Sequence, residues 1–172
     1  MINAKSRMSV CLQLGIVLFT AALAGSAPAT ARGTSGHDAG VAVPFKGDVE
    51  GVETYDLSNF PTMLVDTTAG GVATHLGRYT VTWEFTVDLT TGAGSGSAHY
   101  VAANGDSLYT TVVGQGDPSG IPGVNQVVET HTITGGTGRF AGASGSFTQV
   151  RLAAPTETFG WFEGTIVLAK GK

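Results

Sequence analysis

The feature that most restricts the fold of this chain is a series of short runs of β-branched and aromatic residues separated by glycine-rich turns. From Phe45 onward, no apolar period of about 3.6 residues extends over a helical length, and short β-branched and aromatic runs take its place. We therefore predict an all-β fold of about eight strands without a helix. The predicted strands are Phe45–Tyr55, Thr62–Ala69, Tyr79–Thr90, Ser95–Ala103, Ser107–Gly114, Val124–Thr134, Arg139–Leu152 and Phe159–Ala169.

The segments between these runs have the chemistry of turns. Asn104-Gly105 is a strong hairpin signal, because both residue types tolerate a positive φ. The segment Gly116–Gly123 contains two prolines and three glycines, which bar a strand and predict a longer loop. Strands at this spacing predict an antiparallel eight-stranded barrel or a sandwich of two sheets, and we favour the barrel.

Alternation is clearest in the third run. Period two places successive side chains on opposite faces of a sheet, so the aromatic and aliphatic set should face the interior. We predict that Trp83 is more buried than Glu84, and that Phe85 is more buried than Thr86. The inward set is Tyr79, Val81, Trp83, Phe85 and Val87.

Composition excludes two broad classes of protein. The chain has 13 acidic residues against 9 Lys and Arg, a net charge of −4. Because nucleic-acid binding needs a basic patch, nucleic acid is not an expected partner. A hydrophobic fraction of 42% with so low a net charge is enough to form a core, which argues against a disordered chain.

The N-terminus has the three parts of a secretory signal peptide. Lys5 and Arg7 form a basic segment, residues 10–23 form an apolar segment, and small residues at 25–31 offer cleavage sites. The apolar segment is shorter than the about 20 residues that span a bilayer, so we prefer cleavage to an uncleaved anchor. We therefore expect a secreted, extracellular protein without stable membrane insertion after processing.

Cleavage fixes the domain organisation of the mature protein. The small-residue rule allows cleavage after Ala27, Ala29 or Ala31, and Pro28 disfavours the first. Cys11 is removed with the signal peptide, so no disulfide or thiolate metal site is expected. The predicted parts are a signal peptide at 1–29, a flexible N-terminal lead at 30–44 and a β-barrel domain at 45–172.

The most distinctive segment of the chain is the glycine-rich stretch at residues 133–147. It is not a phosphate-binding loop, because the glycine spacing of a dinucleotide fingerprint is incomplete and a strand is predicted to follow. We expect bulges or close backbone contacts at Gly142 and Gly145. The segment resembles the Gly-Gly-Thr-Gly-x-Phe-x-x-Ala-x-Gly pattern of the allene oxide cyclase and dirigent superfamily. The matching residues are Gly135, Gly136, Thr137, Gly138, Phe140, Ala143 and Gly145.

The resemblance implies a calycin-like eight-stranded barrel of a small secreted bacterial member of this superfamily. It implies a lumen that binds one small hydrophobic molecule, no cofactor, and a homo-oligomer, either trimer or dimer. Allene oxide cyclases close a ring by holding the conformation of a reactive epoxide, and dirigent proteins steer the coupling of phenoxy radicals. If the protein is an enzyme, the resemblance therefore implies a cofactor-independent cyclase or isomerase. The matching glycines carry no chemistry themselves.

Glu129 and His131 are the candidate catalytic residues. They lie two positions apart in one predicted strand, so they point the same way, and a carboxylate can orient an imidazole as an acid/base pair. They share a face with Val127 and Ile133, which predicts that this face is buried. The alternative is a polar row facing solvent, as isolated charges on strands usually are.

Aromatic residues and one further carboxylate are the candidate ligand-binding residues. Aromatic side chains can line an apolar cavity, although they also dominate ordinary cores. A metal site built from His75, His99 and His131 is a weaker alternative, because nothing in their spacing requires it. The alternative function is a non-catalytic extracellular interaction domain with a packed core. The ligand-binding candidates are Tyr79, Trp83, Phe85, Tyr100, Tyr109 and Glu163, with Trp161 and Phe162 as further aromatic candidates.

Overall fold

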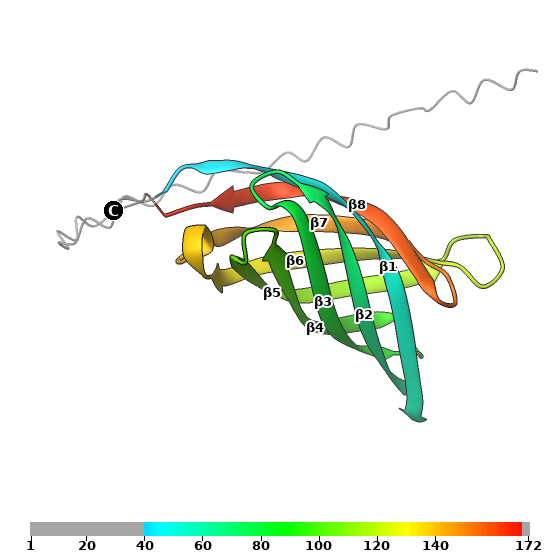
Figure 1. The fold of residues 1–172 in the computed structure, drawn as a ribbon. Helices are drawn as coiled ribbons and strands as arrows, with labels where there is room; N and C mark the ends of the chain where they lie inside the picture. Colours follow the sequence, from blue (N-terminus) through cyan, green and yellow to red (C-terminus); the bar gives the residue numbers. More distant parts are fainter. Residues whose placement is uncertain (1–39, 170–172) are drawn as a thin grey trace, which may run out of the picture. The chain divides into compact units, whose positions relative to one another are not determined.

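A computed structural model describes residues 40–169, and they form a single closed barrel of eight antiparallel strands (Figure 1). Each strand pairs with the next along the chain, and β8 closes the barrel against β1. The predicted all-β barrel is therefore confirmed, and the sandwich alternative is wrong. The strands are β1 (Ala42–Asn59), β2 (Thr62–Ala73), β3 (Gly77–Asp88), β4 (Ala93–Ala102), β5 (Ser107–Pro118), β6 (Asn125–Gly136), β7 (Ser144–Ala153) and β8 (Glu157–Val167).

Several boundaries differ from the prediction. Strand β1 begins at Ala42, inside the segment that we assigned to a flexible lead, and β5 continues to Pro118, into the segment that we predicted as a loop. Residues 138–140 form a 3-10 helix before β7, where a continuous strand was predicted. The predicted signal peptide lies outside the described residues. Within residues 40–169, no helix is long and apolar enough to cross a membrane.

The glycine-rich segment explains the turn between β6 and β7. Gly138 has a φ of +54°, and a Cβ atom there would collide with the carboxylate of Asp106. Gly145 has a φ of +124°, and a Cβ atom would lie 2.4 Å from the carbonyl oxygen of Thr165. The close backbone contact predicted at Gly145 is therefore present, whereas Gly142 serves the turn with a φ of +73°.

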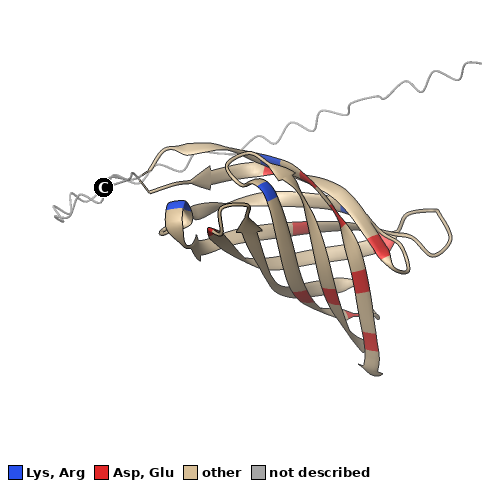
Figure 2. Ribbon diagram, in the orientation of Figure 1, with Lys and Arg blue, Asp and Glu red and all other residues tan. Residues whose placement is uncertain are grey.

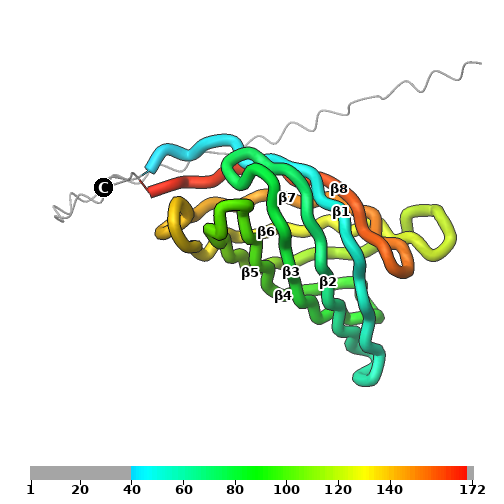
Figure 3. The backbone as a smooth tube through the Cα atoms, viewed as in Figure 1, coloured from blue at the N-terminus to red at the C-terminus, as the bar shows by residue number. Residues whose placement is uncertain are grey.

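Side chains of β3 alternate strictly between the lumen and the outer wall. In β3, Trp83 is 1% exposed and Phe85 is 4% exposed, whereas Glu84 and Thr86 are exposed, so both predicted burial orders are confirmed. The continuous course of the backbone around the lumen can be followed in Figure 3.

One half of the lumen is filled by aromatic and aliphatic side chains. The rings of Phe147 and Phe162 lie 4.8 Å apart, and Phe45 lies 5.1 Å from Phe162. Leu76, from the β2–β3 turn, and Phe140, from the 3-10 helix, are buried in the same cluster. We call this half the closed end of the barrel; the opposite half holds the candidate site.

Candidate ligand-binding site in the open half of the barrel

The end of the barrel opposite the closed end opens into a cavity of about 480 Å³. Its rim comes from the loops that follow β1, β3, β5 and β7, and we call this rim the mouth. Apolar side chains form most of its wall. They are Leu57, Met63, Val65, Phe85, Val87, Leu89, Val127 and Ala153.

The cavity is open because two neighbouring strands carry glycine at inward positions. Gly94 in β4, and Gly114 and Gly116 in β5, line the cavity where the closed end carries large side chains. A Cβ atom at Gly114 would lie 2.7 Å from Cγ of Glu129, so this position must stay small for the carboxylate to fit. A Cβ atom at Gly116 would meet nothing closer than 3.8 Å, so a larger residue there would fill the cavity.

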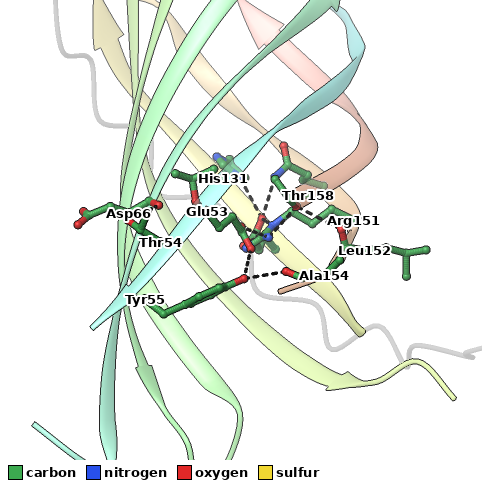
Figure 4. Close-up of polar contacts among 12 residues, drawn as sticks. Glu53, Thr54, Tyr55, Asp66, His131, Arg151, Leu152, Ala154 and Thr158 are labelled. Atoms are coloured by element: carbon green, nitrogen blue, oxygen red, sulfur yellow. Dashed lines mark hydrogen bonds and ion pairs between the residues drawn. The ribbon is translucent and has the colours of Figure 1, made fainter. Parts of the chain in front are cut away.

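The floor of the cavity is an ion cluster of Glu53, Glu129 and Arg151. Figure 4 shows Glu53 and Tyr55 pointing toward Arg151. Nη2 of Arg151 donates to Oε1 of Glu129 at 2.8 Å, and its Nε lies 3.1 Å from both oxygens of that carboxylate. Nη1 of Arg151 donates to Oε1 of Glu53 and, at 2.9 Å, to the hydroxyl oxygen of Thr158. One guanidinium therefore joins two carboxylates from β1 and β6, and it also lies over the ring of Trp83 at 5.7 Å.

These contacts determine the charge of Glu129. Burial alone raises the pKa of this carboxyl, but the charge of the Arg151 guanidinium and its hydrogen bonds to both carboxylate oxygens outweigh burial and lower the pKa to about 2. Gln149 adds a hydrogen bond from its amide to Oε2 of Glu129 at 2.8 Å. Glu129 is thus ionised at neutral pH and serves Arg151 as a counterion, which makes it a poor proton acceptor.

His131 lies beneath the floor and does not line the cavity. Its Nε2 is 3.9 Å from Oε2 of Glu129, too far for a hydrogen bond, and no described residue is a hydrogen-bond partner of this atom. The hydroxyl groups of Thr110 and Tyr100 lie 3.1 and 3.3 Å from its Nδ1. Burial lowers the pKa of His131 despite the nearby Glu129 carboxylate, so the ring is neutral at pH 7.

Tyr55 connects the floor to the mouth. Its hydroxyl group lies 2.7 Å from Oε2 of Glu53 and 3.1 Å from the carbonyl oxygen of Ala154, and its ring lines the cavity. Burial, the hydrogen bond to Glu53 and the charge of Glu53 all raise the pKa of Tyr55. The phenol is therefore protonated at neutral pH and donates to Glu53.

The structure brings together some of the predicted site residues. Glu129 is 1% exposed and His131 is 0% exposed, so the predicted inward orientation is confirmed and the solvent-facing alternative is wrong. Tyr79, Trp83 and Tyr100 are also inward but belong to the packed core. Among the predicted ligand-binding residues, Phe85 lines the cavity.

Two predicted ligand-binding residues lie on the outer wall instead. Tyr109 is 41% exposed and stacks on His99 at 4.8 Å, and Glu163 is exposed. Trp161, a further aromatic candidate, is 61% exposed, whereas Phe162 is buried. In β8 both faces carry apolar residues, so alternation alone could not show which face is inward.

The residues that the sequence analysis missed are Glu53, Tyr55, Gln149 and Arg151. A signal was present: Glu53 has the same parity as Phe45 and Val49 in one long strand, and Arg151 has the same parity as Phe147. The weaker metal alternative finds no support, because no group of three His, Cys, Asp or Glu residues within 40–169 could hold a metal ion.

The structure defines a small antiparallel barrel with a cavity at one end of its lumen, a class that can hold one small ligand. No protein-family model and no curated protein sequence matches the chain. Among solved structures, a pterocarpan synthase dirigent protein matches with a TM-score of 0.56 and 11% identity, over 83% of this chain and 98% of that one. The fold is therefore a closed eight-stranded antiparallel barrel similar to that of a dirigent protein, as the resemblance of the glycine-rich segment implied.

Proposed function

We propose that this protein binds a small hydrophobic molecule in the open half of its barrel. The observation that carries this proposal is the cavity of about 480 Å³, whose apolar walls end on a buried ion cluster. Apolar walls favour a hydrophobic body by about 25 cal/mol per Å² of buried apolar surface. The polar floor fixes the orientation of the ligand, as a few placed polar groups do in most ligand pockets.

The same geometry supports a steering role without a cofactor. A ligand in a one-ended cavity is held in one conformation and shielded from water, which is the contribution that conformational catalysis needs from a protein. Tyr55 and Glu53, at the junction of wall and floor, are better placed than Glu129 and His131 to exchange a proton with a ligand. The alternative of a packed interaction domain is supported only by the closed end.

Secretion and self-association belong to the same proposal. The signal peptide predicted at 1–29 would deliver the barrel outside the cell. Apolar residues of the outer wall lie side by side across three strands, with the exposed Val128 opposite the half-buried Val150, and Val150 opposite the exposed Trp161. We propose that this wall supports a homo-oligomer, and native mass spectrometry of the mature protein would give its stoichiometry.

A cavity-filling substitution tests ligand binding. The probe is 1-N-phenylnaphthylamine, a neutral dye that becomes fluorescent in apolar surroundings. We expect the native protein to bind it. Gly116→Leu should weaken binding by about tenfold or more, because a leucine side chain in the cavity would displace part of the dye and remove about 1–2 kcal/mol of apolar burial. The matched control is Thr111→Leu, which adds the same side chain to the outer wall of the same strand and should bind normally. Absence of dye binding by the native protein would overturn the proposal.

A further inference from the structure

The ion cluster at the cavity floor carries an excess of negative charge. Glu53 and Glu129 contribute two carboxylates, Arg151 contributes one guanidinium, and the neighbouring His131 is neutral. The formal charge of the floor is therefore −1. Glu53 is 4% exposed and Arg151 is 5% exposed, so water does little to stabilise this excess charge.

The donors of Arg151 are almost fully engaged within the cluster. Its Nε and Nη2 bind Glu129, and its Nη1 binds both Glu53 and Thr158. A ligand therefore meets a floor whose positive charge is already neutralised. Oε2 of Glu53 accepts a hydrogen bond only from Tyr55 among the described residues, so it retains capacity to accept another.

The mouth carries the same sign of charge as the floor. Four exposed acidic residues flank the four loops of the mouth, and those loops contain no Lys or Arg. The exposed cations among residues 40–169 lie toward the closed end, in β1, β3 and the 3-10 helix (Figure 2). The acidic residues at the mouth are Asp56, Asp88, Asp117 and Glu157.

We infer that the cavity selects an amphiphilic cation, an apolar molecule whose protonated amine reaches the Glu53 side of the floor. This inference rests on the proposed function and adds the charge of the ligand to it. An ammonium group would complete the ion cluster by balancing the excess carboxylate, and the Tyr55 and Phe85 rings in the wall favour a cation further.

An anionic amphiphile would be repelled by the same floor. Its carboxylate would face two buried carboxylates in surroundings of low dielectric constant, where like charges repel strongly. A neutral alcohol would bind through its apolar body and could still donate a hydrogen bond to Glu53. The expected order of affinity is therefore amine, then alcohol, then carboxylate.

Three ligands with the same alkyl chain test this order. Decylamine, decanol and decanoate, below the concentrations at which they form micelles, compete with the neutral dye at pH 7. The amine is protonated there, as the lysine side chain is. We expect decylamine to displace the dye at a concentration about tenfold lower than decanol, since a charged hydrogen bond in a buried site contributes this much. Decanoate should be weaker than decanol.

The preference should depend on the floor and not on the mouth. In about 1 M salt, where the Debye length is about 3 Å, attraction by the exposed acidic residues is screened but the buried preference should persist. Glu53→Gln should bring the affinities of decylamine and decanol to within about twofold of each other, because the excess negative charge of the floor is removed. The matched control, Glu84→Gln, makes the same change on the outer wall and should retain the advantage.

The outcomes separate this inference from the proposed function. If decanol displaces the dye but decylamine does no better, the inference is overturned and the proposed function stands. Loss of the amine preference in high salt would also overturn it, because the floor would then not be its source. If the dye itself does not bind to the native protein, the proposed function fails.

Discussion

Arg151 organises the interior of the barrel at the scale of single residues. It is the one cation in the lumen among residues 40–169, and it bridges carboxylates that lie 98 and 22 positions away in the sequence. A buried ion cluster costs desolvation energy, so it is not by itself a source of stability, but removing one member leaves the others unpaired. The cluster therefore makes the fold sensitive to changes at the cavity floor.

Replacement of Arg151 tests this sensitivity. We expect Arg151→Met to lower the free energy of unfolding by about 3–5 kcal/mol, because two buried carboxylates lose their counterion. Urea unfolding followed by tryptophan fluorescence measures the change. The triple variant that adds Glu53→Gln and Glu129→Gln should recover part of the loss. A loss under about 1 kcal/mol for Arg151→Met would show that the cluster is hydrated.

His131 gives the protein a specific dependence of stability on pH. Burial lowers the pKa of His131 in the folded protein below its ordinary value of 6.5. At a pH between the folded and the unfolded pKa, the unfolded chain therefore binds more protons than the folded one. The contribution of His131 to the free energy of unfolding is therefore at its full size above pH 6.5, and it decreases as the pH falls below 6.5. A second decline follows below pH 4.5, as the pH falls towards the Glu129 pKa of about 2.

The first of these declines is assigned by substitution. We expect the free energy of unfolding of the unsubstituted protein to fall between about pH 7.5 and 5.5. His131 contributes a slope of at most about 1.4 kcal/mol per pH unit to this decline. His131→Gln should flatten that part of the profile, because it removes the titrating ring. His99→Gln, on the outer wall, should keep the decline; an unchanged profile in His131→Gln would contradict the assignment.

At the scale of elements, β3 shows how one strand serves both halves of the lumen. Tyr79 packs in the aromatic cluster of the closed end, with its ring 5.6 Å from Tyr100. Trp83 lies beneath Arg151, and Phe85 reaches the cavity wall. Strict alternation thus carries one strand from packed core through the floor to the binding surface.

Truncation of single β3 side chains measures how much the inward and the outward face contribute to stability. We expect Phe85→Ala to lower the free energy of unfolding by about 3 kcal/mol, at the lower end for a buried aromatic residue, because its neighbouring cavity is already open. Thr86→Ala, on the outer face of the same strand, should change it by less than about 0.5 kcal/mol. Thermal unfolding of both variants supplies the comparison, and equal effects would mean that Phe85 contributes little to the core.

At the scale of the whole molecule, the barrel is polarised along its length. The closed end combines an aromatic core with Lys46, Arg78 and Arg139 on its surface, whereas the mouth combines a cavity with acidic residues (Figure 2). This separation places the stabilising packing away from the site, so the site can remain partly empty. Because each strand pairs with the next along the chain, successive connections lie at alternate ends of the barrel. The loops after β1, β3, β5 and β7 therefore gather at the mouth.

Processing is the prediction that concerns the complete chain. We expect secreted protein to begin at Thr30 or Arg32, because cleavage after Ala29 or Ala31 satisfies the small-residue rule. N-terminal sequencing of protein recovered from culture medium measures this directly. Material that begins at Met1 would contradict the predicted signal peptide.

The sequence by itself determined most strands, most turns and the faces of β3, and it favoured the burial of Glu129 and His131 over a polar row facing solvent. These features are local, since strand parity and turn chemistry depend on residues within a few positions. The glycine-rich segment also predicted a dirigent-like barrel fold, and the structure has that fold.

Only the tertiary structure decided which polar groups meet in the lumen. Glu53 and Arg151 lie in β1 and β7, which are separated in the barrel by β8, so closure of the sheet and not spacing in the chain joins them. The inward face of β8 and the outward position of Tyr109 were decided in the same way. Strands β5 and β8 carry apolar residues on each face, so the face that is buried depends on the register that barrel closure imposes.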